Sequence, residues 1–140
     1  MLLTNNKMAI SRQKKSEIID RLKSAVSTSR SLVFVNFSGV SVAEVGDMRK
    51  ELRDERIKYE VAKKKLLGIA LGSRDISGDK PDLPGEIAVA YLTDVSEEAD
   101  ITAPARKVFQ FQKKFDGKVK IVGGVFEGKF MSLEQMTGIA

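Results

Sequence analysis

The feature that most limits the fold of this chain is a regular exchange of short apolar runs for amphipathic stretches. Runs with strand character occupy residues 31–37, 57–62, 86–92 and 118–124, and residues 125–130 are expected to pair back as a hairpin. Apolar residues at helical spacing fill most of the intervals. Strands that alternate with helices, without a long repeat, predict an α+β fold. We expect a two-layer α/β sandwich of the split βαβ (ferredoxin-like) kind, with about four to five strands and flanking helices.

Capping residues predict where the helices begin. Residues 12–28 form an amphipathic stretch for which Ser11 is a candidate N-cap. Ser41 and Glu44 have the S-x-x-E spacing of a capping box. Pro104 is tolerated near a helix start, because the first N–H groups of a helix lack intrahelical partners in any case.

Length and composition indicate one globular domain. A chain of 140 residues with 42% hydrophobic and 31% charged residues can bury roughly two-thirds of its unfolded surface. We expect residues 1–7 to be an extension, because Met8 begins a second plausible start, and residues 8–131 to be the globular part. Residues 132–140 have the character of a C-terminal helical segment that is cut short. Without an apolar run of roughly 20 residues or a secretory signal, a cytoplasmic protein that contacts no membrane is expected.

Cysteine and histidine are both absent, and this excludes several classes of site. Disulfides, iron–sulfur clusters, thiol nucleophiles and the usual zinc sites all need one of these residues. The commonest general base near neutral pH is also missing. We therefore expect a protein that is not an enzyme and that holds no metal or cofactor.

Charge is distributed unevenly along the chain. The net charge is +5, yet residues 1–65 carry a net +7 and residues 75–100 a net −7. Such asymmetry is typical of a protein with one face toward a polyanion.

A run of three lysines stands where a strand becomes a helix. Lys63, Lys64 and Lys65 are expected at the helix N-terminus, which already bears roughly half a positive charge. A phosphate there would make the electrostatic energy favourable, because both the lysines and the helix N–H groups would bind it. The basic segment near the chain start raises the same question: Arg12, Lys14 and Lys15. Charge alone leaves open whether these cations bind a polyanion or are simply solvated.

Two further motifs favour structural explanations. The sequence GGVFEGK (123–129) fits G-x-x-x-x-G-K, but Phe130 stands where a nucleotide-binding P-loop needs Ser or Thr, and its glycines are better explained as turn residues. VFQFQKKF (108–115) interleaves aromatics with bases as an RNA-stacking strand does, yet Val108, Phe111 and Phe115 share one helical face. Core packing is the preferred interpretation, with Lys113 and Lys114 solvated.

Five pieces of the chain, in order, resemble one known family along nearly its whole length. The pieces are MAISRQKK, NFSGVSVAEVGDMRKELR, YEVAKKKLLGIAL, EIAVAY and KIVGGVFEGKFMSLEQM. They are similar to the bacterial large-subunit ribosomal stalk-base proteins, ribosomal protein L ten (uL ten). The family's aromatic–x–Gly turn, its R-x-x-L-R helix end and its G-G-x-x-x-G-K segment all have counterparts here.

The resemblance implies a function in translation. Residues 8–131 would bind ribosomal RNA of the GTPase-associated centre in the large subunit, beside the eleventh large-subunit protein. A C-terminal helix, where present, would carry dimers of the acidic stalk protein that recruits translational GTPases. The implied role is anchoring, without bond chemistry or a cofactor. An assembly adaptor of the same fold is the alternative, and an enzyme using GGVFEGK is a more distant one.

The family's basic positions carry over in part. Arg12 and Lys15 match the basic start, with Lys14 between them, and Lys63 matches the Lys of the family's K-N-T. Phe37 and Gly39 match the turn, but Ser38 stands where the family commonly has Arg, and Asn36 where it has Asp. Lys64 and Lys65 replace Asn and Thr. The RNA-facing charge is thus expected to be redistributed. The implied RNA-binding residues are Arg12, Lys14, Lys15, Phe37, Ser38, Gly39, Lys63, Lys64 and Lys65.

Overall fold

The computed structural model has one five-stranded sheet and five helices among the residues it describes, which are 2–81, 83, 85–93 and 99–139, with side chains from Arg12 onward. The strands are β1 (Ser31–Phe37), β2 (Ile57–Ala62), β3 (Ile87–Leu92), β4 (Val119–Phe126) and β5 (Lys129–Ser132). The helices are α1 (Leu2–Thr28), α2 (Val42–Asp54), α3 (Lys64–Gly72), α4 (Ala103–Lys114) and α5 (Leu133–Ile139). Every strand expected from the sequence is present. The ends of the first four differ by at most two residues, whereas the returning strand of the hairpin begins at Lys129, four residues later than expected.

The sheet has the strand order of a split βαβ fold. Its order is β2-β3-β1-β4-β5, and every pair of neighbours is antiparallel. The β1-α2-β2 unit leaves room for β3 between its strands, and the β3-α4-β4 unit does the same for β1. This confirms the predicted α+β, ferredoxin-like class; β5 extends the sheet at the β4 side, and β2 remains an open edge strand.

Two hydrophobic cores lie on opposite faces of the sheet. Val33 and Val35 of β1 pack in the core beneath α2, α4 and α5. Leu32 and Phe34, which alternate with them, pack in a second core with α1 and α3. All six residues of β3 are buried, in the same alternating manner. Burial on both sides explains why these strands are continuous apolar runs, whereas a half-exposed strand alternates apolar and polar residues.

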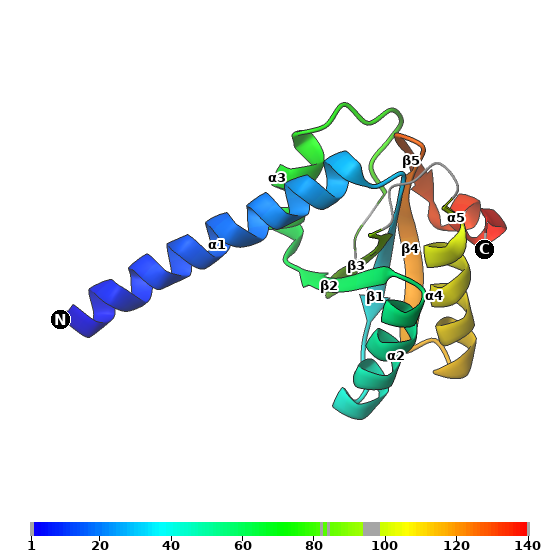
Figure 1. The fold of residues 1–140 in the computed structure, drawn as a ribbon, viewed down its shortest axis with the longest axis horizontal. Helices are drawn as coiled ribbons and strands as arrows, with labels where there is room; N and C mark the ends of the chain where they lie inside the picture. The colour runs from blue at the N-terminus through cyan, green and yellow to red at the C-terminus, as the bar shows by residue number, and fades with distance from the viewer. Residues whose placement is uncertain (1, 82, 84, 94–98, 140) are drawn as a thin grey trace.

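The sheet with α2, α4 and α5 forms the predicted sandwich, and α1 and α3 cross the other face as a pair (Figure 1). The contact uses the second half of α1, where Leu22, Ala25 and Val26 are buried. The first half extends beyond the rest of the molecule (Figure 1). On α3 the buried residues are Leu66, Leu67, Ala70 and Leu71, the apolar face expected from the sequence.

The predicted capping box is present, but the predicted start of the first helix is wrong. The Glu44 N–H donates to Ser41 Oγ at 3.1 Å, and the Ser41 N–H donates to Glu44 Oε1 at 3.0 Å. The bond from the Ser41 N–H to the carboxylate lowers the pKa of Glu44, since it favours the charged form. Ser11 instead lies inside α1, which begins at Leu2. Met8 and Ala9, just upstream of Ser11, are good helix formers, so a residue that suits an N-cap does not end the helix.

The two tyrosines supply a pH prediction. Burial raises the pKa of both Tyr59 and Tyr91 to about 12, from 10.0. Because folding holds both phenols neutral, their contribution to stability is fully present below pH 10 and is lost as the pH rises from 10 toward 12. Tyrosinate absorbance of the folded protein is therefore expected to rise near pH 12, and that of the urea-unfolded protein near pH 10. The chain has no tryptophan to obscure the signal, and coincident titrations would contradict the burial of both rings.

Candidate nucleic-acid interface

Strand register brings the predicted turn and the lysine run to one end of the sheet. Ile87 of β3 pairs with Ala62 at the end of β2 and with Asn36 near the end of β1. The turn that follows β1 and the helix that follows β2 therefore leave the sheet at the same end. Two segments of the expected site, far apart in sequence, are neighbours in the fold.

The lysine run lies at the start of α3, as predicted. Lys63 is the N-cap residue and its side chain makes no capping hydrogen bond. Lys63, Lys64 and Lys65 are all exposed, and none forms an ion pair with a described residue. With no acidic residue in the first turn, nothing there offsets the positive end of the helix dipole. The apolar residues of α3 face the core, so the lysines are left to the solvent side.

A fourth lysine joins this run from the loop between α3 and β3. Lys80 and Lys64 line a hollow of about 270 Å³ together with Pro81 and Leu83. Pro81 is held against β4, because a Cβ on Gly123 would lie 2.7 Å from its Cγ. We call Lys63, Lys64, Lys65 and Lys80 the lysine cluster. No local pattern in the sequence singles out Lys80, because its position depends on the contact of the neighbouring Pro81 with β4.

The turn after β1 forms a hollow of its own at the same end. It measures about 490 Å³ and is lined by Asn36, Phe37, Ser38, Gly39, Val40, Gly85 and Glu86. Ser38 and Gly39 are exposed, and Gly39 has φ of 73°, a left-handed conformation that glycine adopts freely. The Ser38 N–H donates to the Lys118 carbonyl at 2.8 Å, which fixes the turn against the start of β4. Phe37 is half-buried and packs on the core below α2, so its ring supports the turn.

Lys120 is a second cation that the sequence did not single out. It pairs with Asn36 across β1 and β4, so both side chains lie on the face of the sheet that carries α3. The side chain of Lys120 is exposed at the same end as the turn. An exposed lysine in an alternating strand is ordinary, and only the register identifies its neighbours.

The basic segment of α1 lies apart from these groups. Arg12, Lys14 and Lys15 are exposed on the half of α1 that precedes its contact with α3. Because the helix begins at Leu2, these cations lie within it and not at its N-terminus, so the dipole argument made from the sequence was wrong for them. They are on the same side of the sheet as the lysine cluster (Figure 1), but the structure does not bring them against it.

Comparison with known proteins identifies the family. A family model described as "Ribosomal protein L10" matches residues 10–113 of this chain. The chain belongs to the ribosomal protein L10 family. Large ribosomal subunit protein uL10 of Bacillus licheniformis is 30% identical over 126 residues, which is 90% of this chain and 72% of that protein. The uL10 proteins of Lactobacillus acidophilus and Lactobacillus helveticus are each 35% identical over the same shares.

The G-G-x-x-x-G-K segment of this L10-family chain is a strand and a turn. Val125 pairs with Phe130 and Phe126 with Lys129, and the turn between them has Glu127 at φ of 52° and Gly128 at φ of 77°. No loop is available there to wrap a phosphate, which excludes the P-loop. Gly124, however, is not the turn residue that the sequence suggested. A Cβ there would meet the Leu32 carbonyl oxygen and would lie 2.8 Å from Met136 Cε, so close packing requires the glycine.

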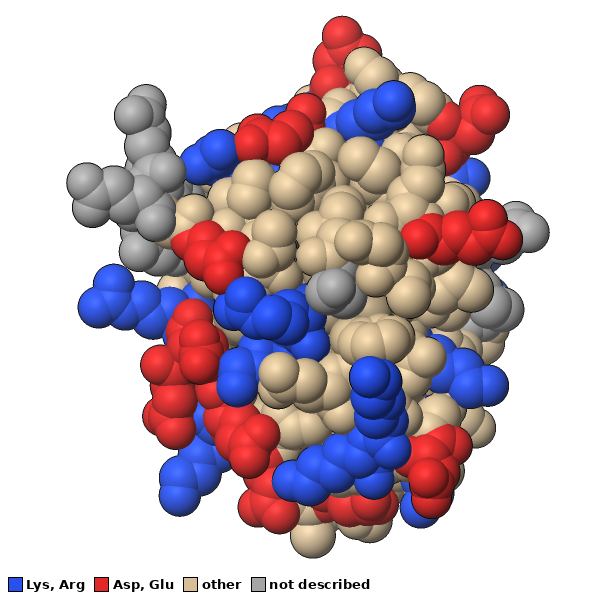
Figure 2. Space-filling view, turned by 90° about the vertical axis from the view of Figure 1, so that its right-hand side faces the viewer, with Lys and Arg blue, Asp and Glu red and all other residues tan. Residues whose placement is uncertain are grey.

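The aromatic segment of the L10-family fold is core, as predicted. Val108, Phe111 and Phe115 of VFQFQKKF are buried beneath the sheet, while Lys113 and Lys114 are exposed. Among the described residues there is no group of acidic side chains that could hold a metal ion, and no helix long and apolar enough to cross a membrane. On the face that carries α4 and α5, acidic and basic side chains are interspersed around an uncharged area (Figure 2).

Proposed function

We propose that this protein is a structural constituent of the large ribosomal subunit that binds ribosomal RNA of the GTPase-associated centre and forms the base of the ribosomal stalk. Membership of the L10 family supports the ribosomal role. RNA binding would use the lysine cluster and the turn Phe37–Gly39, with Arg12, Lys14 and Lys15 as outlying contacts. No catalytic step, metal or cofactor is part of the proposal.

The observation that carries the RNA-binding proposal is the lysine cluster at the start of α3. Three consecutive exposed lysines without a described acidic partner stand at the positive end of a helix, where cations are the unfavourable sign. A backbone phosphate placed there would interact favourably with the lysines and with the first N–H groups of α3. Each phosphate that is neutralised releases counterions, which favours binding at low salt. The electrostatic repulsion at the start of α3 in the free protein thus becomes an attraction in the complex.

The turn after β1 suits a close approach by the RNA backbone. Gly39 has no side chain to block it, and nothing lies within 4 Å of where its Cβ would be. Ser38 offers a hydroxyl in place of the Arg that is common in the family, while Lys64, Lys65 and Lys80 add charge across the same end. We infer that the cationic surface has moved from the turn toward α3.

Two protein partners complete the proposal. The neighbouring eleventh large-subunit ribosomal protein would lie beside the RNA-binding end, and acidic stalk dimers would bind a C-terminal helix. Within the described residues α5 spans only Leu133–Ile139, with Met136 buried against the sheet. Stalk recruitment would therefore need a longer helix than α5. This part of the proposal rests on family membership.

Sedimentation tests the proposal in the cell. We expect the protein, detected in ribosome fractions, to stay with mature large subunits after a high-salt wash. This result would support a resident structural role. Release by salt, or occurrence in precursor particles alone, would instead favour an assembly adaptor of the same fold. A resident large-subunit protein outside the stalk region provides the control for the wash.

A further inference from the structure

A hollow on the α2 face of the sheet gathers arginines that the proposed RNA-binding end does not include. It measures about 430 Å³ and lies between α2 and the start of the edge strand β2. Its lining residues are Arg49, Arg53, Arg56, Ile57, Lys58, Tyr59 and Thr93. Small-molecule and nucleotide sites occupy hollows of about 300–1,000 Å³, so this one can admit a nucleotide unit.

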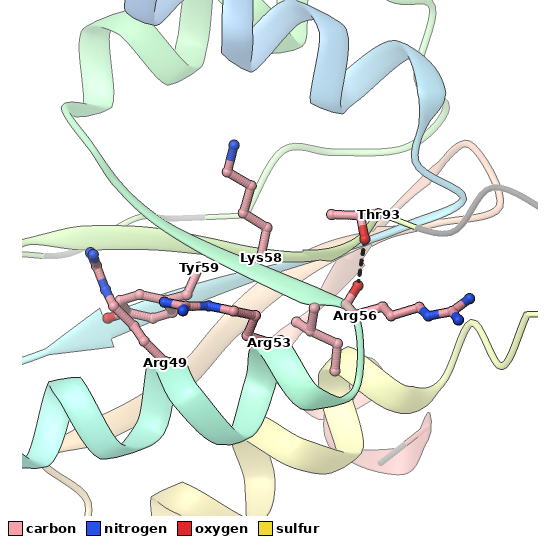
Figure 3. Close-up of a pocket in the computed structure, with 7 residues that line it drawn as sticks. Arg49, Arg53, Arg56, Lys58, Tyr59 and Thr93 are labelled. Carbon is pink, nitrogen blue, oxygen red and sulfur yellow. Dashed lines mark hydrogen bonds between the residues drawn. The ribbon is translucent and has the colours of Figure 1, made fainter.

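Two of these arginines converge on one tyrosine ring. Arg49 and Arg53 extend from α2 toward Tyr59, whereas Arg56 points away and Lys58 leaves the opposite side of β2 (Figure 3). The Arg49 guanidinium carbon lies 5.5 Å from the centre of the Tyr59 ring, within the range of a cation–π contact. Tyr59 is 6% exposed, so the ring is a fixed platform for the guanidinium.

Neither arginine is neutralised by a residue that the structure describes. Arg49 and Arg53 form no ion pair with a described residue. Glu55, two residues after Arg53, is paired instead with Lys107, with 3.6 Å between Glu55 Oε1 and Lys107 Nζ. Like charges one helical turn apart repel each other and disfavour the helix. The Tyr59 hydroxyl is buried and has no hydrogen-bond partner among the described residues, so it does not compete with a phosphate for either guanidinium.

The position of Arg49 and Arg53 relative to the lysine cluster indicates which ligand they bind. Tyr59 precedes Lys63 by four residues of extended chain, a separation of about 13 Å. Among the described residues β2 pairs only with β3, so its other edge is open between the arginine hollow and the lysine cluster. Guanidinium groups bind phosphate in a bidentate manner, which makes paired arginines suited to a nucleic-acid backbone.

We propose that Arg49 and Arg53 form a second RNA phosphate site, so that the bound RNA follows the open edge of β2 from the lysine cluster to the α2 face. The inference rests on the proposed RNA-binding function and adds a contact surface to it. Tyr59 orients Arg49 through the contact of its ring with the guanidinium.

Salt-dependent binding tests the proposal. For a large-subunit rRNA fragment of the GTPase-associated centre, the double variant Arg49→Ala/Arg53→Ala is expected to bind roughly tenfold or more weakly than wild type at physiological salt. The slope of log K against log salt should fall by roughly 1.4 to 1.8 if both contacts are lost. Arg49→Lys/Arg53→Lys keeps the charge and should recover most of the slope but only part of the affinity. Lys113→Ala/Lys114→Ala removes two cations from α4 and should change neither quantity.

A second readout separates this proposal from the function on which it rests. In the isotope-labelled full chain, the Nε–H resonances of Arg49 and Arg53 are expected to shift on titration with a short oligouridylate. If wild type binds rRNA but neither the slope nor these resonances change, the arginine site is wrong and RNA binding by the lysine cluster stands. If the resonances shift but rRNA is not bound, the proposed function fails instead. Normal rRNA affinity with lost incorporation into subunits would assign the arginines to a protein partner and overturn the proposal.

Discussion

Replacing Lys63, Lys64 and Lys65 by alanine is expected to weaken binding to large-subunit ribosomal RNA by roughly a hundredfold at physiological salt. Each phosphate contact contributes roughly 0.7 to 0.9 to the slope of log K against log salt, so losing three should flatten the slope by about 2 to 3. Filter binding over a series of salt concentrations measures both quantities. Unchanged affinity and slope would mean that the three lysines are solvated surface.

The same variant should separate binding from folding. The three side chains are exposed and lie at the positive end of α3, and alanine is the best helix former. The free energy of unfolding is therefore expected to stay the same or rise slightly, while RNA binding falls. Replacing the three lysines by arginine is the matched control, because it preserves the charge and should preserve the salt slope. A loss of stability in the alanine variant would show that the lysines support the fold.

Gly124→Ala is expected to lower the free energy of unfolding by about 1–3 kcal/mol, the usual cost of overpacking a core. The added methyl would meet the Leu32 carbonyl of β1, which is backbone and cannot rotate away, and would lie 2.8 Å from Met136 Cε and 2.9 Å from Met136 Sδ. Urea denaturation monitored by circular dichroism measures the change. Adding Met136→Ala should lower the stability further, because the contact with Leu32 remains and truncation of the buried Met136 leaves a cavity.

A glycine in α2 provides the opposite control. Gly46 has no atom within 4 Å of where a Cβ would lie, and it occupies the interior of the helix. Gly46→Ala should therefore raise the free energy of unfolding by about 0.5–1 kcal/mol. If Gly124→Ala behaved in the same way, the close approach of β1, β4 and α5 would be wrong.

The elements of the fold were predictable because their signals are local. The Ser41–Glu44 capping box and the period of VFQFQKKF depend on residues within one or two turns, and both predictions were confirmed. The start of α1 was predicted wrongly, because an N-cap signal is weak where helix formers lie on both sides of it. The packing role of Gly124 was also not predictable, since a close approach between strands produces no pattern in the neighbouring sequence.

The candidate site was predictable only where it follows directly from a strand end. The lysine run after β2 and the turn after β1 could be found from sequence, since each adjoins a recognisable strand. Lys80, Lys120 and the arginine hollow could not, because each depends on register, loop path or the packing of α2 on β2. Arg49 and Arg53 are visible as a helical pair, but nothing in the sequence places Tyr59 beneath them.

The residues between β2 and β3 occupy a place where a simple hairpin would close. Ala62 and Ile87 already pair, so the whole of residues 63–86 is an insertion that the sheet does not need for its strand order. Its apolar side is bound to the core beside α1, but the lysines lie on the other side, where substitutions change charge and leave packing alone. During evolution, single mutations on this side can therefore change the electrostatic affinity for RNA without lowering the stability of the fold. Lys64 and Lys65, which the resemblance to the family sets against Asn and Thr, lie at positions where such an evolvable insertion accommodates a change.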